Sequence, residues 1–272
     1  MNRVNNRLLT LCADDFGQSA AINQGILQLL QLNRLHAVSV MSQGSAWAVG
    51  APALNEFREG ADIGLHLNLT HRFGNDIHAR PLSAWLLRAF SGGIDQRAVR
   101  DTFRRQIDLF VQQLGRLPDY LDGHQHVHAF PGIREVLPEL ISEYWQATNP
   151  PWVRAPDRLI DDGRVPFKAW VLRRATRGFV ERLEHTGLRC NTGFAGLYAL
   201  TPSADFVQLM QGWLHSLPTN TLMMVHPGEQ SDDTHDPIRT ARYIELEYLR
   251  GAAFGEQLRA AGVTLARLAS FK

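Results

Sequence analysis

Short apolar runs alternate with longer amphipathic segments along almost the whole chain. The first apolar run, RLLTLCA at 7–13, has the length of a buried strand, and residues 19–33 then repeat apolar side chains at helical spacing. Ser19 precedes this repeat and is expected to cap the helix. The two segments predict a first strand–helix unit.

The same alternation continues to the C-terminal end. Further strands are predicted at 36–41, 61–69, 118–123, 152–155, 188–191, 221–227 and 263–268. Helices are predicted at 47–57 with an interruption near Pro52, 95–115, 131–147 with a start at Pro131 and a bend at Pro138, 167–186, 203–215 and 238–261. This order predicts a parallel sheet with helical crossovers, and about seven strands favour a distorted, TIM-like (β/α) barrel over an open sheet.

One segment interrupts the alternation. Residues 70–94 contain Gly, Pro and His without sustained periodicity, apart from a short helix predicted in SAWLLRAF. We expect an insertion over one end of the fold, where loops often contact substrate. No linker, repeat or low-complexity stretch divides the chain, so residues 1–272 are predicted to form a single α/β domain.

The composition narrows the class of protein. The 272 residues carry a formal net charge of +1, which gives no reason to expect a nucleic acid or an anionic membrane as partner. Cys12 and Cys190 are the two cysteines, so a disulfide framework is excluded and a reducing cytoplasm is the simplest location. The apolar runs are too short for a signal peptide or a transmembrane helix.

Ionisable residues recur where the predicted strands end. Asp14 and Asp15 end the first strand, His66 lies near the end of the third, Arg154 ends WVRAP and His226 ends TLMMVHPG. The carboxyl ends of parallel barrel strands meet at one face, so we expect these side chains on a common rim. Each residue alone has an ordinary explanation as a turn, surface or ion-pair residue, and the prediction therefore depends on their combination.

The segment YLDGHQHVH adds three histidines after the fourth predicted strand: His124, His126 and His128. Alternate positions of an extended segment point the same way, so we expect the three imidazoles on one side, although not all three can bind one ion. One Asp with two His is a sensible ligand set for a divalent ion that keeps positions open for water and substrate.

The neighbouring acids Asp14 and Asp15 fit this site. Adjacent residues that leave a strand point in different directions, so one carboxylate can bind the ion while the other stays free to take a proton from water. A cationic His on the opposite rim would then protonate a leaving nitrogen. The pattern predicts a metal-assisted hydrolase.

Four motifs resemble the signature blocks of the YdjC-like carbohydrate deacetylases: ADDFG, GLHLNLT, YLDGHQHVHAFPG and MMVHPGE. Their order and spacing match over about residues 8–270. The resemblance implies a distorted (β/α) barrel, one divalent metal ion, and hydrolysis of an N-acetyl group from an amino sugar, a chito-oligosaccharide or a related glycan. It also implies that Asp15, His66 and His124 bind the metal and that Asp14 is the catalytic base.

Similarity to the wider polysaccharide deacetylases implies that His226 is the general acid and that Arg154 orients the base. The chain departs from the typical family motif, which has three consecutive histidines after Asp-Ser. Here Gly123 follows Asp122, and Gln125 separates His124 from His126. The expected ligand His124 is retained, so the departure concerns its surroundings.

Several points stay open on the sequence alone. Two imidazoles and a carboxylate suit Zn²⁺, whereas the resemblance also allows Mg²⁺. The same site could hydrolyse another amide or a phosphoester, or the barrel could bind sugar without catalysis, although a spare carboxylate argues against the last. The roles of Asp122, His126 and His128 are not assigned.

Two regions are expected to determine what the protein contacts. Residues 159–199 match no motif and are expected to shape the pocket for a small N-acetylated saccharide. The apolar residues Trp85, Leu86 and Phe90 of the insertion would permit a homodimer contact.

Overall fold

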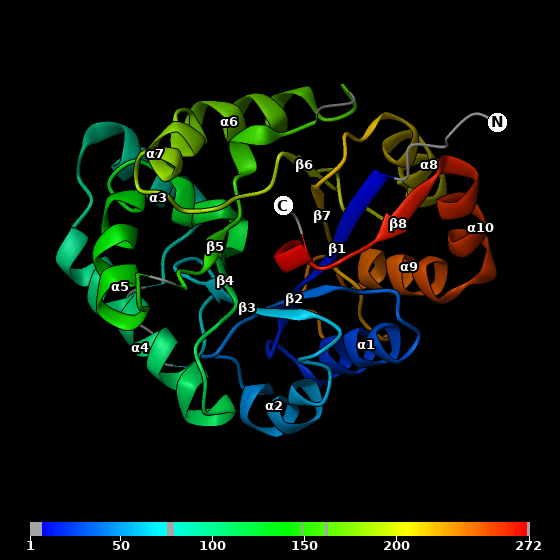
Figure 1. The fold of residues 1–272 in the computed structure, drawn as a ribbon, viewed down its shortest axis with the longest axis horizontal. Helices are drawn as coiled ribbons and strands as arrows, with labels where there is room; N and C mark the ends of the chain where they lie inside the picture. Colours follow the sequence, from blue (N-terminus) through cyan, green and yellow to red (C-terminus); the bar gives the residue numbers. More distant parts are fainter. Residues whose placement is uncertain (1–6, 75–78, 148, 161–162, 271–272) are drawn as a thin grey trace.

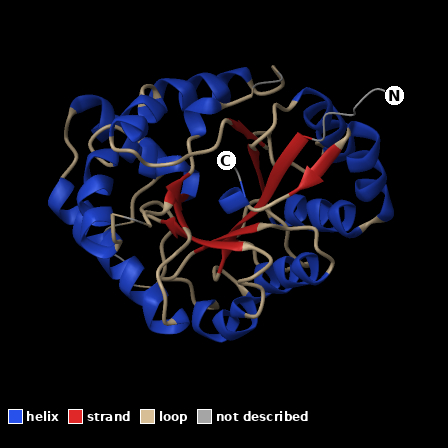
Figure 2. Cartoon of the chain, in the orientation of Figure 1, coloured by secondary structure: helices blue, strands red, loops and turns tan. Residues whose placement is uncertain are grey.

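The longest strand, β1 (Arg7–Phe16), lies at the centre of a curled parallel sheet that helices surround (Figure 1, Figure 2). The computed structural model describes residues 7–74, 79–147, 149–160 and 163–270. Within them seven strands follow the order β5-β4-β3-β2-β1-β7-β6, and an eighth, β8, pairs with β1. The other strands are β2 (Ala37–Val40), β3 (Asp62–Leu67), β4 (Tyr120–Gly123), β5 (Trp152–Val153), β6 (Gly193–Ala195), β7 (Thr221–Val225) and β8 (Val263–Leu265).

The sheet curls until its two edges nearly meet. Isolated bridges join Val153 of β5 to Cys190, which precedes β6, and Leu159, which follows β5, to Phe194 of β6. The predicted distorted (β/α) barrel is therefore confirmed, with an irregular seam in place of a full ladder between β5 and β6.

Helices cover the outside of this sheet (Figure 2). They are α1 (Ala20–Gln31), α2 (Trp47–Asn55), α3 (Leu82–Ser91), α4 (Gln96–Leu114), α5 (Leu137–Tyr144), α6 (Pro166–Thr176), α7 (Phe179–His185), α8 (Phe206–Ser216), α9 (Arg239–Arg250) and α10 (Ala252–Ala261). The Ser19 hydroxyl accepts a hydrogen bond from the Ile22 N–H, which confirms the predicted cap of α1. Within the described residues, no helix combines the length and the hydropathy needed to cross a membrane.

Two apolar clusters hold the fold together. The larger one lies between the sheet and the outer helices, and the smaller one fills the barrel with side chains such as Cys12, Tyr120 and Phe194. Leu268, in a 3₁₀ turn at 268–270, joins the smaller cluster, and this turn lies in the middle of the ring in Figure 1. The interior is thus a packed core and not a pore.

Five predicted elements differ from the structure. The helix predicted at 167–186 forms two helices, α6 and α7, separated at 177–178, and the helix predicted to start at Pro131 begins only at Leu137. Residues 188–191 form no strand, because the Asn191 side chain instead bonds to the carbonyls of Ala155 and Gly193, and β6 begins only at Gly193. Pro138 stands in the first turn of α5 and does not bend a longer helix, since that position needs no N–H donor. Residues 238–261 form two helices separated at Gly251, and α2 continues through Pro52 without interruption.

The insertion contains the predicted short helix, α3, while its residues 75–78 lie outside the described residues. The dimer surface expected there is wrong in part. Trp85 is buried and its indole N–H donates to the Leu69 carbonyl at 2.8 Å. Leu86 is half-buried against the core, and Phe90 alone of the three is exposed, with the Arg174 guanidinium 5.4 Å from its ring centre. The homodimer remains a prediction.

Candidate metal and catalytic site

The candidate site residues lie directly beyond the inner apolar cluster, on the side of the carboxyl ends of the strands. Two positions before each of four of them stands a residue of the inner apolar cluster: Cys12 before Asp14, Tyr120 before Asp122, Trp152 before Arg154 and Met224 before His226. Side chains of a strand alternate between its faces, so the residue two positions later also faces the interior. The candidate catalytic side chains therefore form the last layer of side chains in a filled barrel, as in other (β/α) barrels.

Asp15 reaches this layer by a different route. Regular alternation would turn it outward with Leu11 and Ala13, into the outer core. The pairing of β1 with β2 instead shifts register between Ala13 and Phe16, and Asp15 has a φ of 72°. A bulge of this kind redirects a side chain, and Asp tolerates the left-handed conformation better than most residues.

Both acids consequently converge on His66, where divergent directions were expected. The Nε2 atom of His66 lies 3.5 Å from Asp15 Oδ1 and 4.0 Å from Asp14 Oδ2. The difference in role between Asp14 and Asp15 must therefore come from the other residues that each carboxylate contacts.

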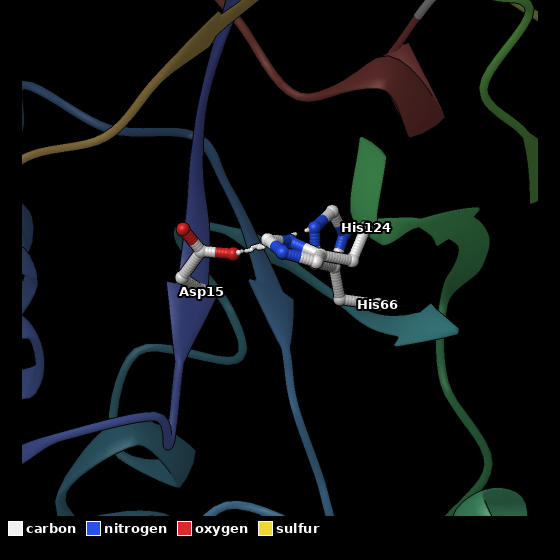
Figure 3. Close-up of side chains that lie close together, drawn as sticks. All are labelled: Asp15, His66 and His124. Carbon is white, nitrogen blue, oxygen red and sulfur yellow. Dashed lines mark hydrogen bonds and ion pairs between the residues drawn. The ribbon is translucent and has the colours of Figure 1, made fainter. Parts of the chain in front are cut away.

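Asp15, His66 and His124 form a compact group of three potential metal ligands (Figure 3). One ligand atom from each lies within 4.8 Å of the others, and His124 Nδ1 is 3.1 Å from Asp15 Oδ1. Asp122 accepts a hydrogen bond from His66 Nδ1 at 2.7 Å, which fixes the ring with Nε2 directed at Asp15. One carboxylate oxygen and two imidazole nitrogens, with an orienting carboxylate behind, fit a divalent cation.

Asp14 is held by Arg154. The guanidinium donates to both carboxylate oxygens, at 2.6 and 2.7 Å, and Arg154 has no exposed surface. Burial opposes ionisation of Asp14, but the Arg154 charge outweighs it and holds the pKa of this carboxyl well below its usual value. Asp14 is therefore a carboxylate throughout the neutral pH range.

A second group with ligand spacing, formed by Cys12, Asp14 and Asp122, already has a cation among its members. Arg154 Nη2 lies 3.1 Å from the Cys12 sulfur and 2.6 Å from an oxygen of each carboxylate. A guanidinium in these contacts takes the place that an ion would need.

Arg242 of α9 holds the other acid. Its Nη2 donates to Asp15 Oδ2 at 2.7 Å, and its Nε donates to Asp236 at the same distance. Burial raises the pKa of Asp15, but the charge of Arg242 and the neighbouring His124 outweigh this and lower it well below its usual value. The ion pair occupies one oxygen of Asp15 and leaves Oδ1 directed at the histidines.

His226 follows β7 and contacts Glu245 of α9. The buried Glu245 carboxylate accepts hydrogen bonds from the His226 backbone N–H and from the Tyr198 hydroxyl, and its Oε1 is 3.9 Å from His226 Nδ1. Burial lowers the pKa of His226 to about 4, against the opposing charges of Asp14 and Asp15. Burial also raises the pKa of Glu245 to about 7.

The expectation for HQHVH is wrong. The segment is a 3₁₀ turn, His124–Ala129, in which Gln125 and His126 have φ values of 53° and 62°. The three imidazoles therefore point to different places: His124 to Asp15, His126 to the Phe194 ring at 5.2 Å, and His128 to the Arg154 carbonyl at 2.8 Å. Only His124 joins the candidate metal site.

Sequence reasoning missed Arg242, Asp236 and Glu245. The signal was present in α9, whose buried face carries Arg242 and Glu245 beside Leu246 and Leu249. Charged residues on the apolar face of an amphipathic helix require partners, and here the partners lie on β1 and after β7.

The sequence was compared with known proteins. A human protein named carbohydrate deacetylase is 28% identical over 261 residues, which cover 85% of this chain and 77% of the human one. A Serratia marcescens protein named chitooligosaccharide deacetylase is 35% identical over 136 residues, 47% of this chain and 53% of that protein. The second match thus spans about half of that relative.

A solved structure from Enterococcus faecalis V583, described as a cellobiose-phosphate cleavage protein, has the same fold. It superimposes with a TM-score of 0.74 at 18% identity, over 98% of this chain and 99% of that one. The family model described as YdjC-like protein matches residues 8–260. This chain therefore belongs to the YdjC-like family.

Proposed function

We propose that this protein is a metal-dependent deacetylase that hydrolyses the N-acetyl group of an amino sugar or a chito-oligosaccharide. The observation that carries the proposal is the separation of the two adjacent acids: Asp15 lies with His66 and His124, whereas Asp14 lies on Arg154. Relatives named carbohydrate deacetylase and chitooligosaccharide deacetylase support the reaction and the substrate class.

In this proposal Asp15, His66 and His124 hold one divalent ion, either Zn²⁺ or Mg²⁺. Asp14 accepts a proton from the attacking water, and Arg154 orients its carboxylate. Because a carboxylate with a lowered pKa is a weak base, Asp14 needs a water whose own pKa is lowered, which is the chemistry that a divalent ion supplies when bound.

His226 donates the proton that the leaving amine needs. Its imidazole is neutral at pH 7 in the resting protein, because burial lowers its pKa to about 4. His226 must therefore gain a proton before it acts. Glu245 accepts a hydrogen bond from the His226 backbone N–H, and its Oε1 lies 3.9 Å from His226 Nδ1, where a carboxylate charge favours the protonated imidazole. We assign Glu245 as a positioning residue for His226.

The test is acetate release from N-acetylglucosamine and its β-1,4-linked oligomers, after chelation and after return of Zn²⁺ or Mg²⁺. We expect activity only with metal. Asp14→Asn should keep the ion, measured by metal analysis, but lose about 10²- to 10⁴-fold in kcat, the usual contribution of a general base. His124→Ala should lose both ion and turnover.

The matched control is Asp101→Asn, at an exposed position of α4, which should leave metal content and kcat unchanged. Hydrolysis by Asp14→Asn at the wild-type rate would refute the assigned base. Phosphate release from sugar phosphates without acetate release would replace the deacetylase with a phosphoesterase on the same site. Full activity in the chelated protein would refute metal dependence.

A further inference from the structure

Exposed aromatic side chains gather on one part of the surface, where α6, at the outer edge of the ring in Figure 1, contacts α3. Phe167 and Trp170 of α6 are 75% and 63% exposed, and Leu87 and Phe90 of α3 are 71% and 49% exposed. Within the described residues, no other Phe, Trp or Tyr side chain is equally exposed. We call these four residues the α3/α6 patch.

The patch faces solvent because α6 has two different faces. Ala169 and Leu172 lie on the face that is buried against the protein. Phe167, Trp170 and Arg174 recur at helical spacing on the opposite face. The rings of Phe167 and Trp170 are nearly parallel, with an interplanar angle of 21° and 6.4 Å between their centres. The core thus uses one face of α6 and leaves an aromatic face in water.

Trp170 differs in exposure from every other tryptophan of the chain. The remaining five are at most 9% exposed: Trp47, Trp85, Trp145, Trp152 and Trp213. Trp170 also lies within residues 159–199, the region that matches no motif. Because large apolar side chains grouped at a surface favour a partner that covers them, the patch indicates an interaction site.

The helices of the patch carry positive charge alone. Helix α3, helix α6 and the C-cap residue of α6 contain five cations and no acid: Arg88, Lys168, Arg173, Arg174 and Arg177. Asp161 and Asp162 precede α6 and lie outside the described residues. The net charge of +1 for the whole chain conceals this uneven distribution, which favours an anionic partner.

A membrane surface suits the patch better than other anionic or apolar partners. A second copy of the chain in a two-fold contact would bring the five cations of one copy against the five of the other. Nucleic acid interfaces are more polar than a surface of Phe, Trp and Leu. Aromatic rings beside Lys and Arg are typical of helices at a membrane interface, where the rings enter the headgroup region and the cations meet lipid phosphates.

We propose that the α3/α6 patch docks this protein on the surface of an anionic lipid bilayer. Phe167 and Trp170 enter the headgroup region, and Arg174 and Arg177 contact lipid phosphates. The binding is peripheral and reversible, because a few side chains supply it. The inference goes beyond the proposed deacetylase function, since no residue of the patch belongs to the candidate metal and catalytic site.

The experiment sediments the full-length protein with vesicles of phosphatidylglycerol and phosphatidylcholine in equal parts, and with vesicles of phosphatidylcholine alone. We expect binding to the anionic vesicles that salt weakens. Trp170→Ala should lower the partition coefficient about tenfold, because a large apolar side chain no longer leaves water. Arg177→Gln should lower it about fivefold, the usual effect of one cation at an anionic surface.

Matched controls lie on other exposed helices. Val207→Ala on α8 removes an exposed apolar side chain, and Arg259→Gln on α10 removes an exposed cation. Both should bind anionic vesicles as the wild-type protein does. Because Trp170 and Arg177 are exposed, their variants should unfold at the same urea concentration as the wild-type protein.

A second measurement follows Trp170 directly. Because the other five tryptophans are buried, the difference in emission between the wild-type protein and Trp170→Phe reports on residue 170. We expect this difference spectrum to move to shorter wavelength when the anionic vesicles are added, as the indole leaves water.

The outcomes decide between the partners. Absence of sedimentation with anionic vesicles, equal binding to neutral vesicles, or undiminished binding by Trp170→Ala overturns the proposal. A dimer in analytical ultracentrifugation that Trp170→Ala abolishes would assign the patch to a second copy. Tighter binding of single-stranded RNA than of anionic vesicles would assign it to nucleic acid, and either of these results also overturns the proposal.

Discussion

Replacing Arg154 by Met keeps an unbranched side chain but removes the guanidinium and its positive charge, which lies between two buried carboxylates. Arg154 has no exposed surface, and its Nη2 lies 2.6 Å from both Asp14 and Asp122. Removing one partner of a buried ion pair costs about 3–5 kcal/mol, because the remaining charge keeps its desolvation penalty. We expect Arg154→Met to lower the free energy of unfolding by at least this amount at pH 7.

The pH dependence identifies the cause. In the wild-type protein the pKa of Asp14 is lowered, so its contribution to stability is present above the usual carboxyl pKa of about 3.9 and is lost as pH falls through the lower folded value. In the variant, burial without the guanidinium raises that pKa, so the charged form is penalised as pH rises. The difference between the two proteins should be largest near pH 7 and shrink toward pH 4.

Urea unfolding of the chelated proteins, followed by tryptophan fluorescence, measures this difference. The matched control is Arg104→Met, because Arg104 pairs with Glu143 at 2.7 Å on the surface and should cost only about 0–1 kcal/mol. Equal losses in both variants, or an Arg154→Met loss that is the same at pH 4.5 and pH 7, would refute the role given to the buried charges.

Three further predictions address the strands, the thiols and the acid. Gly64→Ala should destabilise by about 1–3 kcal/mol or more in the same assay, because its Cβ would lie 2.3 Å from the Tyr120 ring; a loss below 0.5 kcal/mol would contradict the tight packing. Ellman's reagent should modify only half-buried Cys190 in the native protein, because burial raises the pKa of Cys12 to about 12, and rapid native reaction of both thiols would contradict this. Glu245→Gln should shift the high-pH limb of kcat, where the proposed acid loses its proton, and an unchanged profile would exclude Glu245 from that role.

The sequence predicts well which residues lie on the rim of the barrel, because the hydrophobic pattern shows where the strands end. Asp14 and His66 lie near the carboxyl ends of β1 and β3, Arg154 directly follows β5, and parallel topology brings such positions together. Strand β6 was misplaced because its three residues have too little length for a period to appear.

Two features of the site cannot be predicted from the hydrophobic pattern of the sequence. The bulge that redirects Asp15 depends on how β1 pairs with its neighbours, and the 3₁₀ turn after β4 depends on left-handed conformations at Gln125 and His126. Asp, Gln and His all adopt other backbone conformations more often, so the local sequence could not predict the bulge or the turn. The contact of Arg242 with Asp15 joins positions 227 residues apart and needed the fold.

The two neighbouring acids depend on separate arginines from distant parts of the chain, Arg154 after β5 and Arg242 on α9. A substitution can therefore change the contacts of one acid while the other acid keeps its arginine partner. Under the proposed function, one substitution in the chain could silence the reaction and preserve an intact ion-binding receptor for sugars. Descendants of such a protein could specialise in sensing a saccharide without rebuilding the barrel.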